Sequence, residues 1–337
     1  MTNLEGSVRA VLSMALMIGT AHAAEYPILE APPGLTQVGR NDYASFLEMN
    51  LPRAMAIGSN GAYGWYSSVT SLDDARAKAL QSCANKGASD CRTYAEDLQV
   101  IASPVSIGSP PATLIQGGSY AIVPDSRYFW RGPARARGIY VWGHGKSGWT
   151  DSRGIEPQAH VRIFNNVGFD VVRFDRDPQR DYTDLARDWL RDSAHQLRAM
   201  GYKQIVVGGQ SRGAWNALQT LAVPGLVDGI VAISPASLNY AQAYMQRAEL
   251  QRLLGDANSP NAKVVVVEFA GDGYAGDIAQ RATDVRQALQ GRVASMLLID
   301  QPPGYSGHGA GASPKFALEY GQRIYRFIES TEPSSSP

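Results

Sequence analysis

The sequence predicts an α/β protein in which helices cover both faces of a mostly parallel sheet. From about residue 120 onward, short apolar segments recur, and stretches of helical length with one apolar face separate them. Strands that alternate with such helices form βαβ units, whose strands lie parallel. Hydrophobic residues make up 44% of the chain and charged residues 18%, the balance of a globular protein. A smaller α+β domain is predicted to precede this region.

The N-terminus has the pattern of a secretory signal peptide. Arg9 precedes an apolar stretch over residues 10–19, and Ala21-His22-Ala23 supplies the small residues found before a cleavage site. The apolar stretch is too short for a membrane-spanning helix. We therefore expect residues 1–23 to be removed, so that an exported, soluble protein without a stable membrane span begins near Ala24.

The next block, residues 36–102, is predicted to be the small domain. We expect a strand at 54–58, a helix that Ser71 caps over residues 71–84, and a further strand that begins at Cys91. The chain has two cysteines, Cys83 and Cys91, and both lie in this block. In the oxidising compartment that export implies, such a close pair predicts a local disulfide, with two free thiols as the alternative.

The same block resembles a known family. A strand is followed by Gly64-Trp65, by a helix that ends in Ala79-Leu80-x-x-Cys83, and by Gly87-x-x-x-Cys91 before the next strand. This order resembles the small secreted domain of unknown function called DUF4189. The resemblance implies an exported bacterial protein, periplasmic or extracellular, and implies no particular chemistry.

The parallel sheet is assigned to residues 120–330, after a stretch rich in Pro, Ser and Gly at 103–119 that we interpret as a linker. The clearest helix covers residues 183–200, where apolar side chains form one face and Gly201 ends the pattern. The strands of the sheet are predicted near 138–142, 169–174, 204–208, 229–233, 263–269 and 295–299.

The stretch over residues 205–215 is the most informative in the chain. A β-branched strand leads into Gly209-x-Ser211-x-Gly213, and helix-forming residues follow. The two glycines allow a tight strand-to-helix turn with Ser211 at its tip. There the hydroxyl is exposed at a helix N-terminus, whose backbone amides stabilise a developing negative charge. The pattern predicts a nucleophilic serine, and an ordinary N-cap serine is the alternative.

A serine nucleophile needs a base and an acid. Of the five histidines, only His308 follows Ser211, in a glycine-rich loop between a predicted strand and a predicted helix. A solvated loop histidine is the alternative. We assign the acid to Asp272, because it directly follows a predicted strand at the carboxyl edge of the sheet. Active sites of open α/β sheets lie at that edge. Asp277, which could also cap a helix, and Asp300 remain as alternative acids.

In this order the motifs resemble those of the α/β-hydrolase superfamily, over residues 120–330. His144-Gly145 follows the first long strand, where that family keeps its oxyanion loop, and the serine turn, the acid and the histidine come after it. The resemblance implies that Ser211 is the nucleophile, Asp272 the acid and His308 the general base.

The resemblance also implies an oxyanion hole made of backbone amides. One belongs to Arg212, directly after the nucleophile, and the other to Gly145 or Lys146. Lys146 stands where the family often has a second glycine, so the choice between these two amides stays open. His144 is expected to order the loop, and the Arg212 side chain is expected to be solvated.

These residues predict an exported serine hydrolase, most simply an ester hydrolase with an acyl-serine intermediate and neither cofactor nor metal. A peptidase or amidase of the same fold would use the same residues, and a non-catalytic binding protein of the cell envelope is the third hypothesis. The 31 basic and 31 acidic residues give a formal net charge of zero. That balance favours no nucleic acid or anionic membrane surface as partner, so the expected partner is a small-molecule or polymer ester.

Overall fold

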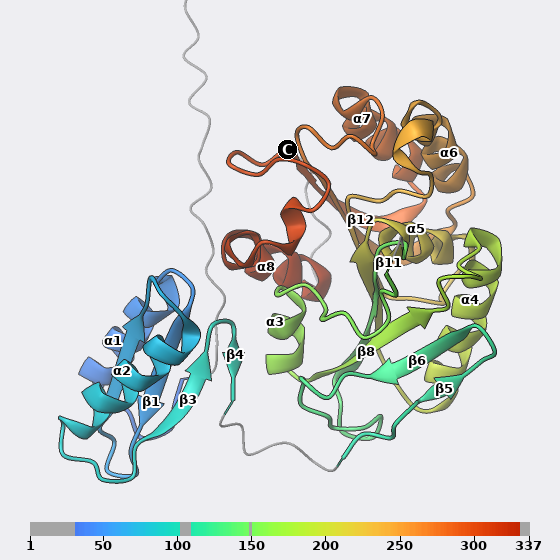
Figure 1. Cartoon of the computed structure of the whole chain (residues 1–337). Helices are drawn as coiled ribbons and strands as arrows, with labels where there is room; N and C mark the ends of the chain where they lie inside the picture. Colours follow the sequence, from blue (N-terminus) through green and yellow to red (C-terminus); the bar gives the residue numbers. More distant parts are fainter. Residues whose placement is uncertain (1–30, 102–108, 148–149, 331–337) are drawn as a thin grey trace, which may run out of the picture.

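The computed structural model of the chain describes residues 31–101, 109–147 and 150–330. The predicted signal peptide and the first residues of the predicted linker lie outside the described residues. The described chain forms two separate sheets, one of four strands and one of eight (Figure 1). We call residues 31–101, which hold the smaller sheet, the N-terminal segment.

The smaller sheet is antiparallel and has the strand order β2-β1-β3-β4. Ser71 caps its second helix as predicted, because its side chain accepts a hydrogen bond from the Asp74 amide. The first helix was not predicted, because few of its positions are both apolar and buried, among them Tyr43 and Phe46. The elements are α1 (Gln37–Glu48), β1 (Arg53–Ile57), β2 (Tyr63–Ser67), α2 (Leu72–Ala84), β3 (Arg92–Glu96) and β4 (Gln99–Val100).

Helix α2 lies directly on β2 because Gly64 places no side chain between them. A Cβ atom on Gly64 would lie 2.4 Å from the backbone nitrogen of Cys83. The buried Cys83 is bonded to Cys91, which immediately precedes β3. The predicted disulfide is therefore confirmed, and it ties the end of α2 to the start of β3.

The larger sheet has the strand order β5-β6-β8-β7-β9-β10-β11-β12. The six neighbouring strands β8, β7, β9, β10, β11 and β12 are all parallel, whereas β6 pairs antiparallel with both β8 and β5. The mostly parallel sheet predicted from the sequence is thus confirmed. The strands are β5 (Ile115–Gln116), β6 (Tyr120–Pro124), β7 (Gly138–Gly143), β8 (Phe169–Arg176), β9 (Ile205–Gln210), β10 (Gly229–Ile233), β11 (Ser259–Glu268) and β12 (Val293–Asp300).

Helices cover both faces of the larger sheet, as predicted (Figure 1). One face packs against α3 and α8 through rings such as those of Phe164 and Phe316. The other face packs against α4 to α7, with Leu190 and Trp215 in its core. The helices are α3 (Val161–Asn166), α4 (Thr183–Ala199), α5 (Arg212–Gln219), α6 (Ala243–Gly255), α7 (Ile278–Leu289) and α8 (Pro314–Glu329). The carboxyl ends of the parallel strands therefore share one edge, and the loops that follow them meet there.

Strand β5 lies inside residues 103–119, the range predicted as a linker. Ile115 pairs with Ile122 of β6, and the Leu114 amide donates to the Ile122 carbonyl. Two strand residues in a stretch rich in Pro, Ser and Gly are too few to form an apolar pattern. The end of the predicted linker is thus part of the larger sheet.

The two sheets are connected where β4 meets α3 and α8. The Asn166 side chain at the end of α3 donates to the Leu98 carbonyl at 2.7 Å and accepts from the Val100 amide at 3.3 Å. The Leu98 side chain is buried together with Ala317 and Leu318 of α8. The N-terminal segment is therefore attached to the helix that follows the His308 loop.

Candidate active site

The turn between β9 and α5 holds Ser211 in a strained backbone conformation. Its φ and ψ are 57° and −117°, outside the regions that residues with a side chain favour. The turn is held on both sides, since the Ser211 amide donates to the Ile233 carbonyl and the Ser211 carbonyl accepts from the amides of Trp215 and Ala236. The Ser211 side chain makes no capping hydrogen bond to α5. The alternative of an ordinary capping serine is therefore wrong.

Two glycines allow β9 and α5 to approach the neighbouring strand closely. A Cβ atom on Gly209 would lie 2.3 Å from the carbonyl oxygen of Gly143, and one on Gly213 would lie 1.9 Å from the same oxygen. Gly143 is the last residue of β7. The spacing Gly-x-Ser-x-Gly is thus required by the packing of this turn, as in a nucleophile elbow.

His308 and Asp272 meet at the same edge of the sheet. The Nδ1 atom of His308 lies 3.0 and 2.9 Å from the two carboxylate oxygens of Asp272. An ionised carboxylate only accepts hydrogen bonds, so Nδ1 carries the proton and Nε2 presents a lone pair. This Nε2 atom is buried and has no hydrogen-bond partner among the described residues. The imidazole is thus oriented to accept a proton.

Asp272 is held by its own loop and by the loop that carries His308. Its side chain is 1% exposed and accepts a hydrogen bond from the Tyr274 amide at 2.9 Å. The Gly307 amide donates to the Ala270 carbonyl, which joins the two loops directly. The carboxylate and the imidazole are therefore fixed relative to each other by backbone hydrogen bonds.

The other two candidate acids have different partners. Asp277 caps α7, because its side chain accepts from the Gln280 amide at 3.3 Å. Asp300 ends β12, and its carboxylate accepts from the side chain of Gln301 at 3.3 Å. In the described part of the chain, Asp272 is the carboxylate that is hydrogen-bonded to His308.

No hydrogen bond joins Ser211 to His308 in the ranges of the chain that the structure describes. Gln210 connects their loops instead, since its side-chain Nε2 donates to the His308 carbonyl at 3.0 Å. In enzymes without bound substrate, the bond between nucleophile and base is often long and tightens on binding. The geometry thus brings the predicted residues to one edge without closing the last contact.

A buried arginine anchors the loop after β7. Arg176, at the end of β8, donates to the carbonyls of both His144 and Gly145. The C=O and N–H of a trans peptide point in opposite directions, so the amides of Gly145 and Lys146 are turned away from Arg176. A Cβ atom on Gly145 would lie 3.6 Å from the Cβ of Ser211. The loop therefore passes beside the serine.

His144 orders this loop from within, as expected. Its Nδ1 lies 2.5 Å from the Gly145 carbonyl, and its Nε2 accepts from the Arg176 amide at 3.3 Å. Burial and the nearby Arg176 charge lower the pKa of His144 to about 3. His144 is therefore neutral at ordinary pH, and both of its ring nitrogens have partners. Lys146 is exposed.

The side chain of Arg212 is buried, which corrects the expectation of a solvated arginine. It is 5% exposed and donates to the carbonyls of Asp181 and Ser237. Burial lowers its pKa. These carbonyl partners lie on loops distant in the sequence, so no local pattern could indicate them. Its backbone amide is the first of α5, as the elbow requires.

Three residues that shape the site were not predicted: Arg176, Gln210 and Tyr274. The Tyr274 ring centroid lies 4.4 Å from that of His308. Arg176 and Gln210 act on backbone carbonyls far away in the sequence, and such contacts leave no sequence pattern. Tyr274 was the one with a local signal, because it stands two residues after the predicted acid.

The other two histidines of the described chain, His160 and His195, are a packing residue and a surface residue away from the site. His160 is buried with its Nε2 3.1 Å from the Tyr140 hydroxyl, and burial lowers its pKa to about 4. His195 is exposed on α4. Neither was predicted to take part in chemistry.

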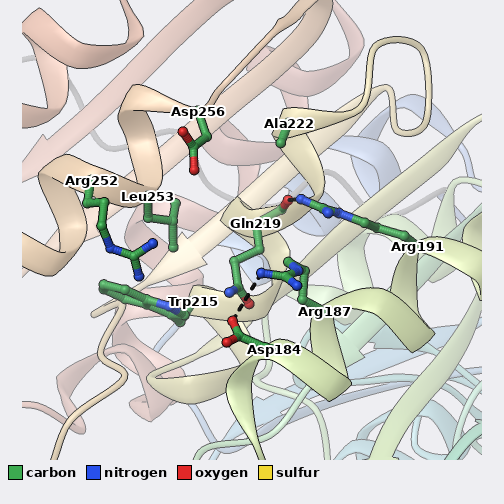
Figure 2. A pocket seen from close by; sticks show the side chains of 9 residues that line it. All are labelled: Asp184, Arg187, Arg191, Trp215, Gln219, Ala222, Arg252, Leu253 and Asp256. Carbon is green, nitrogen blue, oxygen red and sulfur yellow. Dashed lines mark hydrogen bonds and ion pairs between the residues drawn. The ribbon is translucent and has the colours of Figure 1, made fainter.

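A small pocket of about 40 Å³ lies among α4, α5 and α6 (Figure 2). Figure 2 shows its charged lining, in which Arg187 pairs with Asp184 and Arg191 donates to the Gln219 carbonyl. None of the predicted site residues lines it.

Among residues 31–101, 109–147 and 150–330, no helix is long and apolar enough to cross a membrane. In the same ranges, no three His, Cys, Asp or Glu side chains are grouped to hold a metal ion.

Comparisons with known proteins bear on the fold alone. No protein-family model matches the chain, and no curated protein matches its sequence. A protein from Klebsiella pneumoniae named as a dienelactone hydrolase is similar with a TM-score of 0.43 and 13% identity, over 63% of this chain and 92% of its own. An esterase from Pyrococcus furiosus is similar with a TM-score of 0.44 and 15% identity, over 62% and 86%. A prolyl endopeptidase reaches a TM-score of 0.47 at 15% identity, over 71% and 40%.

These scores are too low to carry an argument about this chain. The strand order and the serine turn, taken from this chain itself, are those of an α/β-hydrolase fold. Because no family model matches, the resemblance of residues 36–102 to DUF4189 stays a prediction.

Proposed function

We propose that this protein is a serine hydrolase of carboxylic esters, with Ser211 as nucleophile, His308 as general base and Asp272 as acid. The observation that carries the proposal is the strained serine at the edge of the sheet where the Asp272–His308 hydrogen bond also lies. Such strain persists only where the surrounding structure holds it, and it concentrates in active sites. A non-catalytic binding protein has no physical reason to keep all three features.

The reaction proceeds in two acyl-transfer steps. His308 Nε2 takes the hydroxyl proton as Ser211 Oγ attacks the ester carbonyl carbon, and Asp272 stabilises the resulting imidazolium. The tetrahedral intermediate then expels the alcohol, which receives the proton from His308, and acyl-Ser211 remains. Water attacks the acyl group with His308 again as base, and the carboxylic acid leaves as Ser211 recovers its proton.

Backbone amides stabilise the negative charge that forms on the carbonyl oxygen. The Arg212 amide is one, and it adds the positive end of α5. Gly145 or Lys146 supplies the second, since Arg176 turns both of their amides away from itself. Each such donor typically contributes a factor of about 10² to 10³ in kcat.

Active-site labelling followed by turnover tests this proposal. A fluorophosphonate is expected to label Ser211, and the protein is expected to cleave nitrophenyl esters without added metal. Ser211→Ala should lose the label and at least about 10³-fold in kcat while its thermal stability stays close to that of the unchanged chain. A variant that keeps more than about a tenth of the activity would exclude this nucleophile.

Matched substrates separate the ester hydrolase from the peptidase that uses the same residues. Each nitrophenyl ester is compared with the nitroanilide of the same acyl group. We expect kcat/KM to be much higher for the ester. A preference for the anilide would reassign the protein as an amide-cleaving enzyme. If neither substrate were turned over and the fluorophosphonate did not label Ser211, the hydrolase function would be rejected.

We also infer that the protein is exported from a bacterial cell. The Cys83–Cys91 disulfide supports this, because disulfides persist in oxidising compartments. Mass spectrometry of the protein from its native cells should show an N-terminus near Ala24 and bridged cysteines. An intact N-terminus with reduced cysteines would contradict export.

A further inference from the structure

One tyrosine ring lies beside His308 and a second lies against the first, and the catalytic residues do not require them. We call Tyr240 and Tyr274 the tyrosine shelf. The Tyr274 ring centroid is 4.4 Å from that of His308, and the Tyr240 ring meets Tyr274 edge-on at 5.8 Å. Tyr240 is 67% exposed and Tyr274 36% exposed. Exposed rings next to a reactive group are typical of ligand-contacting surfaces.

The shelf is held in place by the loops beneath it. The Tyr274 amide donates to the Asp272 carboxylate, so the position of this tyrosine depends on the catalytic acid. The Tyr240 ring lies against the backbone of Gly273, where an added Cβ would come within 2.4 Å of it. Asn239 caps the short helix that begins at Tyr240. Rigid rings bind a ligand with little loss of side-chain freedom.

Two more exposed apolar side chains follow Tyr240 in the chain, at the start of α6. Tyr244 and Met245, in its first turn, are 80% and 40% exposed. A flat ring that stacks on a tyrosine gains attraction beyond simple burial, whereas a straight alkyl chain has no face to stack. The arrangement therefore favours substrates with a ring over substrates with a linear chain.

We propose that the tyrosine shelf binds a ring of the substrate, so that the preferred ester carries an aromatic or sugar ring close to the bond that is cleaved. This proposal rests on the hydrolase function proposed above, because the shelf adjoins the proposed catalytic residues His308 and Asp272. An aromatic ring presents a flat π face to tyrosine and a sugar ring presents a face of C–H groups, and the experiment distinguishes them.

Paired substrates test the shelf. Methyl 3-phenylpropanoate is compared with methyl hexanoate, and phenyl acetate and 6-O-acetylglucose are each compared with hexyl acetate. For at least one ring-bearing ester, Tyr240→Ala should lower kcat/KM about 3- to 10-fold, mainly through a higher KM. The linear esters should change less than about twofold. Tyr240→Phe keeps the ring and should keep the preference for ring-bearing esters. Tyr66→Ala, which removes an exposed tyrosine of β2, should leave kcat/KM unchanged on both ring-bearing and linear esters.

The ring-bearing ester that responds shows whether the ring belongs to the acyl group, an aryl alcohol or a sugar. Equal losses on ring and linear esters would show a structural role for Tyr240 and overturn the proposal, as would unchanged kinetics on all three rings. Failure of the hydrolase function looks different. The unchanged protein would then cleave no ester and take no fluorophosphonate at Ser211, and the shelf would lose its proposed role as well.

Discussion

The two sheets bury different kinds of side chains. The N-terminal segment buries two polar side chains, Arg53 and Ser68, and Arg53 serves to donate to the carbonyls at the end of α1. The larger sheet buries whole ion pairs, such as Arg176–Asp181 and Arg281–Glu268. A small segment with a limited core relies on a disulfide, whereas a larger core offsets the cost of buried charges.

This difference bears on where the proposed active site lies. Buried polar groups position loops accurately but cost free energy to remove from water. In the larger sheet, Arg176, Arg212 and Asp272 are among these buried groups and hold the loops of the proposed site, whereas the N-terminal segment contains no histidine. We therefore expect changes in the larger sheet to affect catalysis and changes in the N-terminal segment to affect local stability.

The largest expected effect separates two aspartates of the same loop region. Asp272→Asn should lower kcat by roughly 10³ to 10⁴, because an amide favours the wrong tautomer of His308. Asp277→Asn is the matched control, and it should cost at most about 1 kcal/mol of unfolding free energy with little loss of activity. Steady-state kinetics and urea unfolding of both variants give the comparison. The reverse pattern would move the acid to Asp277.

Mild acid should weaken the larger sheet. The pKa values of buried His144 and His160 are lowered to about 3 and 4 from 6.5, so the unfolded chain binds more protons than the folded one below pH 6.5. The two histidines together should therefore reduce the unfolding free energy by about 3 kcal/mol between pH 6.5 and 5.

Urea unfolding at several pH values, with hydrogen exchange to separate the two sheets, measures this acid effect. His160→Gln should remove about half of it. A free energy of unfolding that stays constant across this pH window would contradict the expectation, and so would equal acid sensitivity in the N-terminal segment.

Reduction of Cys83–Cys91 should loosen the N-terminal segment alone. A bridge with a sequence separation of 8 is expected to contribute about 2 to 3 kcal/mol. Hydrogen exchange should rise in α2 and β3, while kcat/KM stays within about twofold. Loss of activity in step with reduction, with the larger sheet still folded, would show that the contact of β4 with α3 and α8 couples the segment to the site.

The smallest expected effect concerns the loop after β7, the proposed oxyanion loop. Arg176→Lys keeps the charge beside Asp181 but loses the paired contacts to the carbonyls of His144 and Gly145. We expect kcat to fall about tenfold with KM unchanged, because the loop amides lose their alignment with the transition state. Fluorophosphonate labelling should slow in parallel. A change confined to thermal stability would assign Arg176 a structural role only.

The parts of the site that were predicted are those with local patterns. The serine turn follows from glycines two residues away on each side, and the candidate histidine from its position after Ser211. The sequence favoured Asp272 over Asp277 and Asp300 from its place after a predicted strand, and the structure shows that Asp272 is hydrogen-bonded to His308. Arg176 and Gln210 were missed because their partners are carbonyls more than 30 residues away.

The sequence by itself determined the parallel strands of the larger sheet, the disulfide and the serine turn, because each depends on residues close together in the chain or on a repeated pattern. The tertiary structure showed that the Asp272 carboxylate holds His308, and it decided which carbonyls Arg176 and Arg212 bind and which tyrosine adjoins the imidazole. Those contacts join loops that the sheet brings to one edge, and their partners are set by packing in three dimensions rather than by spacing along the chain.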